Sequence, residues 1–488
     1  MPPATTRPAL ARLSLAAALA VAAPLQLTAQ TAYTVDAPPP AGLDRQSAQR
    51  STRTHLENLI GLDTQNPPGS EMLTAQYFDS VFSAIPGFET WILDVGNGRA
   101  NFVARLSASN ATREPVLVMG HMDVVGADTA KWESDPFTAS VRDGYLYGRG
   151  AIDDKGMLAA TTTALQALAR DRDALERDII FLGTAAEEGG DVGIDWVMQN
   201  HAELVNEAEF ALNEGGRIRV RDGRVKTVNI QTTEKVYYEV VGTARGPSGH
   251  GSVPLPDNAL AALARAAARV HEWKPPVRLN ETTRLYFARL AQTEDDPAMR
   301  RAMERISAPD ASDSVINAAA EVLSLEPLHN AVLRTGASLT ILRGGTRANV
   351  IPSEGTVTFN VRVLPGEDIR AVVAEMNRVA AEPQVTFTLA GEPREDPPPS
   401  PVTTALYRAM EAAANTMEPD AVVIPFLSTG ATDGAVLRAH GIPTYGILPM
   451  PLPMEDELRM HGDNERVPLP ALGWATEFIY RVLADVAR

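Results

Sequence analysis

The sequence of 488 residues contains no cysteine and only eight histidines. The absence of cysteine excludes a disulfide framework, a thiolate metal site and a cysteine nucleophile. Any metal site must therefore be built from histidine, aspartate and glutamate. Basic residues are also in the minority, with 44 lysines and arginines against 61 aspartates and glutamates, for a net charge of −17. This balance argues against a nucleic-acid partner, since a general nucleic-acid binder needs a basic face.

Long apolar runs are scarce too. The clearest one, Leu13–Leu27, follows Arg7 and Arg12 and is followed by Thr28 and Ala29, which offer small residues for cleavage. The run is short for a membrane span and contains Pro24, so an uncleaved anchor is the poorer interpretation. We expect residues 1–29 to be a signal peptide and the protein to be exported, periplasmic or secreted, with no stable membrane span after cleavage.

The rest of the chain is long enough for more than one domain. Residues 30–50 are rich in proline and polar residues and are expected to form a tether. Strand-like and helix-like segments then alternate, which favours an α/β domain with a mainly parallel central sheet flanked by helices. We assign residues 51–236 to the first part of this catalytic domain and 392–488 to its second part.

The pattern changes near residue 237, where an alternating strand is followed by the alanine-rich segment 258–270 and, later, by further strand-like stretches. This content predicts a smaller α+β domain, residues 237–391, inserted into the larger one. Its charged segment 271–330 could enlarge the inserted domain or regulate access to a site. The proline-rich stretch 392–401 then leads back to the catalytic domain.

Several apolar segments of the catalytic domain end near polar side chains. His121 and Asp123 follow one segment, Glu187 and Glu188 another, and Glu214 a third. Because the carboxyl ends of parallel strands meet at one edge of a sheet, this placement predicts a common site.

Each motif by itself also has a structural interpretation. His121 and Asp123 leave an extended chain on the same face, as two metal ligands would, but such a pair is also common without a metal. Asp153 and Asp154 precede a helix and could simply cap it. Two adjacent glutamates repel each other in a solvated loop, or they divide two tasks, in which one binds a cation and the other accepts a proton.

The motifs gain weight from their order. His121-x-Asp123, the segment 148–156, Glu187-Glu188-Gly189 and Met460-His461-Gly462-x-Asn464-Glu465-Arg466 occur in succession. Together they resemble the dinuclear zinc amidohydrolases and metallopeptidases, a family that includes aminoacylase, acetylornithine deacetylase, succinyl-diaminopimelate desuccinylase, glutamate carboxypeptidase and carnosine dipeptidase. The resemblance covers roughly residues 52–485.

The resemblance implies two Zn²⁺ ions, although Co²⁺ and Mn²⁺ suit the same donors. It places His121 and Glu214 on one ion and Glu188 and His461 on the other, with Asp153 bridging them. Asn213, beside Glu214, is a much poorer ligand. The implied general base is Glu187. Asp123 orients His121 through its other ring nitrogen, so the first interpretation of both residues as ligands is replaced.

The inserted segment is similar to the family's ferredoxin-like lid and dimerisation domain, which implies a homodimer. By this resemblance His250 enters the neighbouring subunit's site and stabilises the oxyanion. Asn349 is implied to contact the substrate, and Arg362 to pair with a substrate carboxylate. The alternatives are a glycine-rich turn for His250 and a cross-strand salt bridge for Arg362. The loop with Gly430 and Thr432 resembles the one that binds the substrate's carboxylate end, although it departs from the commoner Gly-Gly-Thr version.

These features predict a hydrolase of amide or peptide bonds next to a free carboxylate, of carboxypeptidase or dipeptidase type, acting on small peptides. An N-acyl-amino-acid deacylase is the main alternative. A catalytically dead dimeric binding module is a weaker one, because the full set of ligands and Glu187 is present. A serine hydrolase is disfavoured because no Gly-x-Ser-x-Gly elbow follows a strand.

Overall fold

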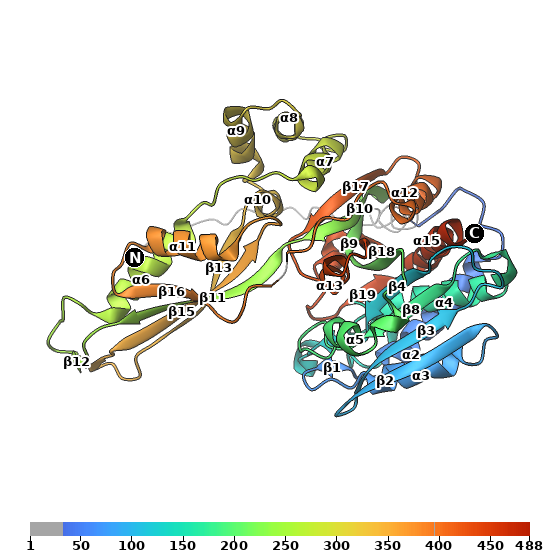
Figure 1. The fold of residues 1–488 in the computed structure, drawn as a ribbon, viewed down its shortest axis with the longest axis horizontal. Coiled ribbons are helices and arrows are strands. Elements are labelled where there is room, and N and C mark those ends of the chain that lie inside the picture. Colours follow the sequence, from blue (N-terminus) through green and yellow to red (C-terminus); the bar gives the residue numbers. More distant parts are fainter. Residues whose placement is uncertain (1–32, 395) are drawn as a thin grey trace, which may run out of the picture.

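The computed structural model describes residues 33–394 and 396–488, so the predicted signal peptide lies outside the described residues. Two sheets organise these residues into a larger and a smaller lobe, with a group of short helices beside them (Figure 1). The fold class expected from the sequence, an α/β catalytic domain with an inserted smaller domain, is confirmed.

The large sheet has eight strands. Their spatial order is β17 (Val422–Ser428), β10 (Arg224–Glu234), β18 (Thr444–Pro453), β9 (Phe210–Arg221), β4 (Val116–His121), β8 (Ile179–Thr184), β3 (Arg99–Leu106) and β2 (Phe88–Gly96). The four central strands β18, β9, β4 and β8 run parallel to one another. Their carboxyl ends therefore share one edge, as the sequence predicts.

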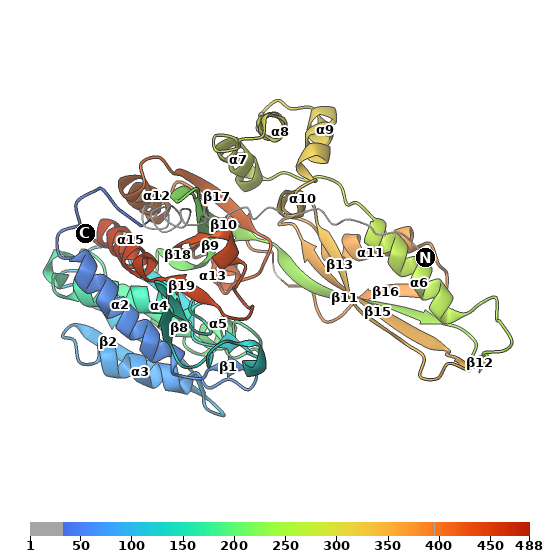
Figure 2. The same cartoon turned by 180° about the vertical axis from the view of Figure 1, so that it is seen from behind.

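Helices cover both faces of this sheet because its central strands are apolar on both sides. In β4, Val116 and Val118 belong to one core, whereas Leu117 and Met119 belong to another. The first face carries α2 (Arg45–Ile60), α4 (Lys155–Ala169), α12 (Ala405–Met417) and α15 (Leu469–Ala487), and the second carries α5 (Ile194–Asn200) and α13 (Gly434–Ala439). Figure 2 shows α2, α4 and α15 side by side on the first face.

The smaller sheet is antiparallel, in the order β13 (Gly336–Gly344), β15 (Glu354–Val363), β11 (Val236–Arg245) and β16 (Val385–Leu389). Helices α6 (Ala259–Glu272) and α11 (Ile369–Ala380) supply its core. We call this sheet and its two helices the lid domain. A single residue, Lys235, separates β10 of the large sheet from β11 of the lid domain, so one nearly continuous strand crosses between the sheets (Figure 1).

Residues 237–391 are expected to form the inserted domain, but the helices in the middle of this range pack against the large sheet instead. Helices α7 (Glu281–Leu290), α8 (Pro297–Ser307), α9 (Asp313–Leu323) and α10 (Pro327–Leu333) share a core with β17, the edge strand of the large sheet. Phe287 of α7 packs in this core with Ile424 and Phe426 of β17. Amphipathic helices can cover any apolar surface, and the exposed edge of the large sheet offers one. These helices therefore cover the catalytic domain rather than enlarging the small sheet.

The described part of the expected tether is also packed. Helix α2 begins at Arg45, inside the range treated as a tether, and Val35 and Leu43 are buried. Arg45 pairs with buried Glu477 of α15 and donates a hydrogen bond of 2.9 Å to the Val35 carbonyl oxygen. These contacts fix residues 35–45 against the C-terminal helix.

Candidate active site

His121 is the last residue of β4 and is buried, with 2% of its side chain exposed. The Asp154 side chain packs closely against the backbone of Gly120, where a Cβ would collide with the Asp154 carboxylate. One ring nitrogen, Nδ1, lies 3.0 Å from the Asp123 carbonyl oxygen and 3.5 Å from Asp123 Oδ1. The other, Nε2, lies 2.8 Å from Asp153 Oδ1. Asp123 thus orients the ring from the side opposite Asp153, which is the geometry of a positioning residue.

Asp153 lies between two histidines. Its Oδ1 faces His121, and its Oδ2 lies 3.1 Å from His461 Nε2. His461 Nε2 is also 3.0 Å from Glu188 Oε1. The potential ligand atoms of Asp153, Glu188 and His461 lie within 4.8 Å of one another, as do those of His121, Glu187 and Glu188. The structure therefore brings together residues from four distant parts of the chain.

Glu187 and Glu188 follow β8 in a turn that Asp123 holds. Asp123 Oδ1 accepts a hydrogen bond of 3.2 Å from Glu187 N, and Oδ2 accepts one of 3.1 Å from Glu188 N. Asn66 completes the arrangement, because its side-chain amide donates to Asp123 Oδ2 at 2.8 Å and to the carbonyl oxygen of Gly189. One carboxylate therefore positions both the histidine and the turn with the two glutamates.

Glu465 plays a similar part for Asp153. Its buried carboxylate accepts hydrogen bonds from the backbone N–H groups of Gly150, Ile152 and Asp153 at 3.0, 2.7 and 3.3 Å. It also pairs with Arg149 at 2.8 Å, and both side chains are no more than 2% exposed. The loop that carries Asp153 is thus fastened to the segment that carries His461.

The electrostatics are those of carboxylates gathered in a buried space. Burial would lower the pKa of His121, but its hydrogen bonds to Asp123 and Asp153 raise that pKa well above its ordinary value. Hydrogen bonds to Asp153 and Glu188 raise the pKa of His461 to about 10. Burial would raise the pKa of Asp153, but the two histidines lower it. The two histidines are therefore the groups that favour the ionised form of Asp153.

The other acids lack such compensation. Burial, reinforced by the negative charge of Asp153, raises the pKa of Glu214 to about 8. Burial, reinforced by Glu214 and Asp433, raises the pKa of Glu187 well above its ordinary value. Cations bound among these groups would favour their ionised forms.

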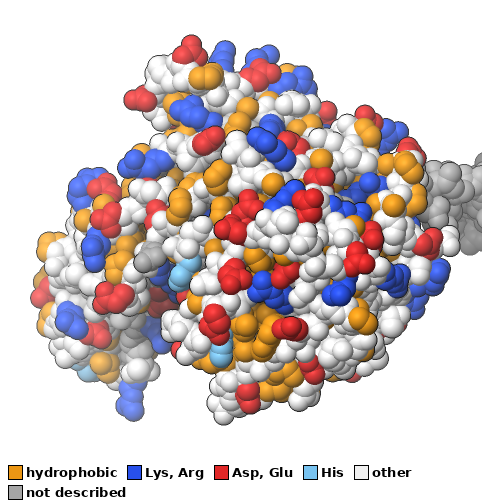
Figure 3. Space-filling view, turned by 45° about the vertical axis from the view of Figure 1, so that its right-hand side comes forward, with side chains coloured by type: hydrophobic (Ala, Val, Ile, Leu, Met, Phe, Trp, Pro, Cys, Tyr) orange, Lys and Arg blue, Asp and Glu red, His pale blue; other side chains and the backbone are white. Residues whose placement is uncertain are grey.

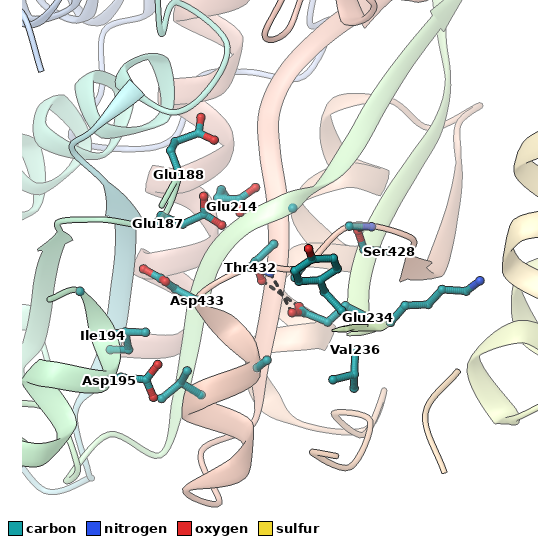
Figure 4. Close-up of a pocket in the computed structure, with 18 of the residues that line it drawn as sticks. Glu187, Glu188, Ile194, Asp195, Glu214, Glu234, Val236, Ser428, Thr432 and Asp433 are labelled. Atoms are coloured by element: carbon teal, nitrogen blue, oxygen red, sulfur yellow. Dashed lines mark hydrogen bonds between the residues drawn. The ribbon is translucent and has the colours of Figure 1, made fainter. Parts of the chain in front are cut away.

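The donors present fit divalent metal ions. They are imidazole nitrogens and carboxylate oxygens, the ligands that Zn²⁺ accepts in cysteine-free sites. Asp153 presents one oxygen to each histidine, and Glu188 presents its buried Oε1 to His461 Nε2 at 3.0 Å. Glu214 lies outside the two groups of close ligand atoms but lines the same cavity. In Figure 4, the carboxylates of Glu187, Glu188 and Glu214 lie together on one side of that cavity.

The cavity has a volume of about 1090 Å³ and extends from these carboxylates to the start of the lid domain. Gly430 and Thr432 line it, from the loop that follows β17, and Arg362 lines it from the lid domain. Figure 3 shows basic and acidic side chains interspersed over the face of the molecule that it presents. Three of the four residues expected to contact substrate thus reach the chain's own cavity.

A buried network holds the loop that carries Thr432. Glu234, the last residue of β10, accepts hydrogen bonds of 2.8 Å from both the backbone N–H and the hydroxyl of Thr432 (Figure 4). Gln231 donates to the same carboxylate at 2.7 Å, and Arg438 of α13 pairs with it at 3.0 Å. The loop is therefore fixed to the strand that continues into the lid domain.

His250 and Asn349 lie elsewhere. His250 belongs to β12 (Gly249–His250), which pairs with β14 (Val350–Ile351) at the tip of the lid domain, away from the large sheet (Figure 1). Both residues are exposed and neither lines the cavity. His250 Nδ1 lies 2.7 Å from the Ser252 hydroxyl. Within one chain these two residues do not join the site.

Several residues of the site escaped the sequence reasoning. Asn66 precedes two prolines, a pattern that indicates a turn but no chemistry. Glu465 lies inside a recognised motif, yet its role depends on loop contacts that spacing does not reveal. Glu234 and Arg438 are 204 positions apart, and nothing in the sequence pairs them. Only the parallel arrangement of β10 and β17 brings the Thr432 loop to Glu234.

Known proteins are similar to this chain in sequence over most of its length. A protein of Dictyostelium discoideum described as probable carboxypeptidase S-like 2 is 28% identical over 382 residues, which cover 77% of this chain and 72% of that protein. The human N-fatty-acyl-amino acid synthase/hydrolase PM20D1 is 26% identical over 385 residues, covering 78% and 76%.

A solved structure has the same fold. The M20 family metallo-carboxypeptidase Sso-CP2 of Sulfolobus solfataricus superposes with a TM-score of 0.66 at 20% identity and covers 89% of this chain and 98% of its own. The model of Peptidase family M20/M25/M40 matches residues 117–485, which include every metal-ligand candidate named above. The resemblance inferred from the sequence is thus confirmed, and the chain belongs to Peptidase family M20/M25/M40 and is a metal-dependent hydrolase.

Proposed function

We propose that the protein hydrolyses an amide or peptide bond next to a free carboxylate, as a carboxypeptidase or dipeptidase with two metal ions. The observation that carries this proposal is Asp153, whose two oxygens face His121 and His461 separately. A carboxylate placed in this way suits a bridge between two cations. We propose Zn²⁺ as the native metal, bound by His121, Glu214 and Asp153 on one side and by Glu188, His461 and Asp153 on the other.

The metals and Glu187 have separate tasks in this proposal. Bound metal ions supply Lewis acidity, which polarises the amide carbonyl and lowers the pKa of water. Glu187 accepts the proton of the attacking water and transfers it to the departing nitrogen. Its turn is held by Asp123 and Asn66, so its carboxylate is positioned before substrate binds. Burial raises the pKa of Glu187, and the positive charge of bound cations would favour its ionised form.

The substrate's carboxylate end is proposed to lie toward Thr432 and Arg362. Arg362 offers a planar guanidinium suited to a carboxylate, and the loop with Gly430 and Thr432 lines the same cavity, with the N–H of Thr432 already bonded to Glu234. The network around Glu234 keeps that loop in place. The scissile amide then lies on the side of Glu187.

We also propose a homodimer formed through the lid domain. Strand β13 lies at the edge of the small sheet and exposes Leu339, Ile341 and Leu342, which are 39%, 41% and 59% accessible. An apolar sheet edge of this kind favours pairing with another chain. A second copy could bring its His250 and Asn349 to this chain's cavity, where His250 would stabilise the oxyanion. Light scattering with Leu342→Asp tests the dimer, which should dissociate, and a dimer of unchanged stability would exclude this edge.

An N-acyl-amino-acid deacylase is the second candidate. The relatives described as N-fatty-acyl-amino acid synthase/hydrolase favour it, and so does the apolar part of the cavity wall. That part is formed by Ile194 of α5 and by Ala435, Val436 and Ala439 of α13. These side chains suit an acyl group better than a charged N-terminus.

One substrate screen distinguishes the candidates. Dipeptides, N-acetyl amino acids and longer N-acyl amino acids are incubated with the metal-loaded protein, and the released amino acid is quantified. Activity confined to peptides supports the first candidate, and activity confined to N-acyl amino acids supports the second. Activity that persists after metal removal has been verified would contradict the metal mechanism. If the protein forms a folded dimer but hydrolyses none of these amides, a catalytically inactive binding module is favoured.

Export remains a proposal based on residues 1–29. Among the described residues, none of the helices has the length and apolar character to cross a membrane. Mass spectrometry of the protein from its native source tests export, because a mature chain beginning near residue 30 is expected and an intact N-terminus would contradict it.

A further inference from the structure

Two arginines meet at the end of the cavity nearest the lid domain. Arg362 comes from β15, and Arg394 comes from the proline-rich linker that returns to the catalytic domain. Arg362 lies on a strand of the lid domain and Arg394 on the linker, yet both line the cavity, and their positive charges are close enough to interact.

The Arg362 side chain and the Arg394 backbone each contact a tyrosine of β11. The Arg362 guanidinium carbon lies 4.8 Å from the centre of the Tyr237 ring, and its Nε donates a hydrogen bond of 3.1 Å to Asn360 Oδ1. The backbone of Arg394 is fastened by the Tyr238 hydroxyl, which lies 3.2 Å from both its N–H and its carbonyl oxygen. Adjacent tyrosines of β11 therefore support the two arginines.

Among the residues that the structure describes, no carboxylate forms an ion pair with Arg362 or Arg394. Glu234 lies near Arg362, but its carboxylate is already occupied by Arg438 and Thr432. Burial lowers the pKa of Arg362, and the charge of Arg394 adds to this effect, whereas Tyr237 and Glu234 oppose it. Buried Arg149 and Arg438 show the usual alternative, since each is paired with a glutamate.

We propose that Arg362 and Arg394 form an anion-binding subsite for an acidic amino acid in the leaving half of the substrate. This inference rests on the proposed hydrolysis of an amide next to a carboxylate. Arg362 binds the α-carboxylate, and Arg394 binds a second carboxylate on the side chain. Two adjacent cations repel each other in the empty subsite, so a ligand with two negative charges gains more there than a ligand with one. The substrate class is therefore N-acyl or peptidyl derivatives of glutamate or aspartate.

The test compares matched substrates that differ by one charge. We measure kcat/KM for N-acetylglutamate and N-acetylglutamine, and for the corresponding dipeptides, with the metal-loaded full chain. The acidic substrate is expected to be preferred by about tenfold, the typical contribution of a hydrogen bond to a charged group. Arg394→Gln should remove most of that preference, and Arg394→Lys should retain part of it.

Arg370 provides the control because it is an exposed arginine of the lid domain that does not line the cavity. Arg370→Gln should leave the ratio of the two kcat/KM values unchanged, which separates a local effect from a change in net charge. Equal kcat/KM values for the acidic and neutral substrates in the unaltered protein would overturn the inference, as would an unchanged ratio in Arg394→Gln.

The two proposals fail differently. Efficient cleavage of neutral substrates without an acidic preference would leave the proposed hydrolase function intact and remove the subsite. Failure to cleave any amide would contradict the proposed function itself. Binding of free glutamate over glutamine, measured by calorimetry with Glu187→Gln, provides a readout that does not depend on turnover. No discrimination between the two amino acids in that experiment would contradict the subsite.

Discussion

Replacing Glu465 by glutamine tests whether this residue fastens the Asp153 loop. Glutamine has the same shape but only one acceptor oxygen, whereas Glu465 Oε1 and Oε2 each accept two hydrogen bonds in this structure. The new NH₂ group must therefore face either Arg149 and Gly150 or the N–H groups of Ile152 and Asp153. In either orientation the side-chain NH₂ group faces two other hydrogen-bond donors and cannot accept from them. Both side chains are buried, so water does not replace the lost hydrogen bonds.

The expected magnitude follows from the burial of the ion pair. Arg149 and Glu465 are 2% and 1% exposed, so solvent cannot compensate the unpaired guanidinium. Breaking a buried pair by removing one partner typically costs about 3–5 kcal/mol. The Asp153 carboxylate should also become less well positioned, and loss of a residue that supports a metal ligand typically lowers metal affinity by about 10–100-fold.

Urea unfolding of the metal-free protein measures the first effect, and competition with a chelator measures the second. Glu57→Gln is the matched control, because Glu57 pairs with Arg53 on the surface of α2, where the side chains are 36% and 43% exposed. The control should lose about 0.3–0.5 kcal/mol, the usual value for an exposed pair on a helix. If Glu465→Gln behaves like this control in both assays, Glu465 does not fasten the loop.

Three further predictions concern other parts of the structure. Asn66→Ala should lower kcat by a larger factor than it changes KM, because the turn with Glu187 loses the hydrogen bonds of the Asn66 amide, which does not contact substrate. A change confined to KM would refute this role. Glu234→Gln should raise KM more than it lowers kcat, since the loop with Thr432 loses acceptors for its hydrogen bonds; steady-state kinetics decide, and an unchanged KM would contradict it. Burial raises the pKa of Glu418 to about 7, so its folded form holds a proton more tightly than the unfolded chain and its contribution to stability falls as pH rises from about 4.5 through 7. Urea unfolding at pH 5 and pH 8 should show a smaller loss for Glu418→Gln than for the unaltered protein, and equal losses would contradict the assignment.

The catalytic half of the site could be anticipated from the sequence because strand ends determine it. His121, Glu187 and Glu214 each follow or lie within an apolar segment, and parallel pairing of β4, β8 and β9 places them at one edge. The local order of residues was therefore enough to predict which side chains converge. The sequence also indicated that another domain interrupts the catalytic one.

The supporting contacts could not be anticipated in the same way. Glu465 accepts hydrogen bonds from backbone N–H groups, which residues of almost every type have. The spacing of residue types therefore does not predict its role. Helices α7–α10 are amphipathic, but amphipathicity does not specify the surface that they cover, which proved to be β17. Arg394 lies in a linker whose proline content indicates an extended chain without showing where its side chains point. Each of these features depends on tertiary contacts between distant segments.

The metal content and turnover of Glu187→Gln, measured on the same preparation, test whether metal binding and proton transfer belong to different residues. We assign metal binding to His121, Asp153, Glu188, Glu214 and His461, and proton transfer to Glu187. We therefore expect two metal ions per chain by elemental analysis, together with a decrease in kcat of about 10²–10⁴-fold, the usual contribution of a general base. Normal turnover, or loss of the metals together with the activity, would contradict the assignment of Glu187 as the base.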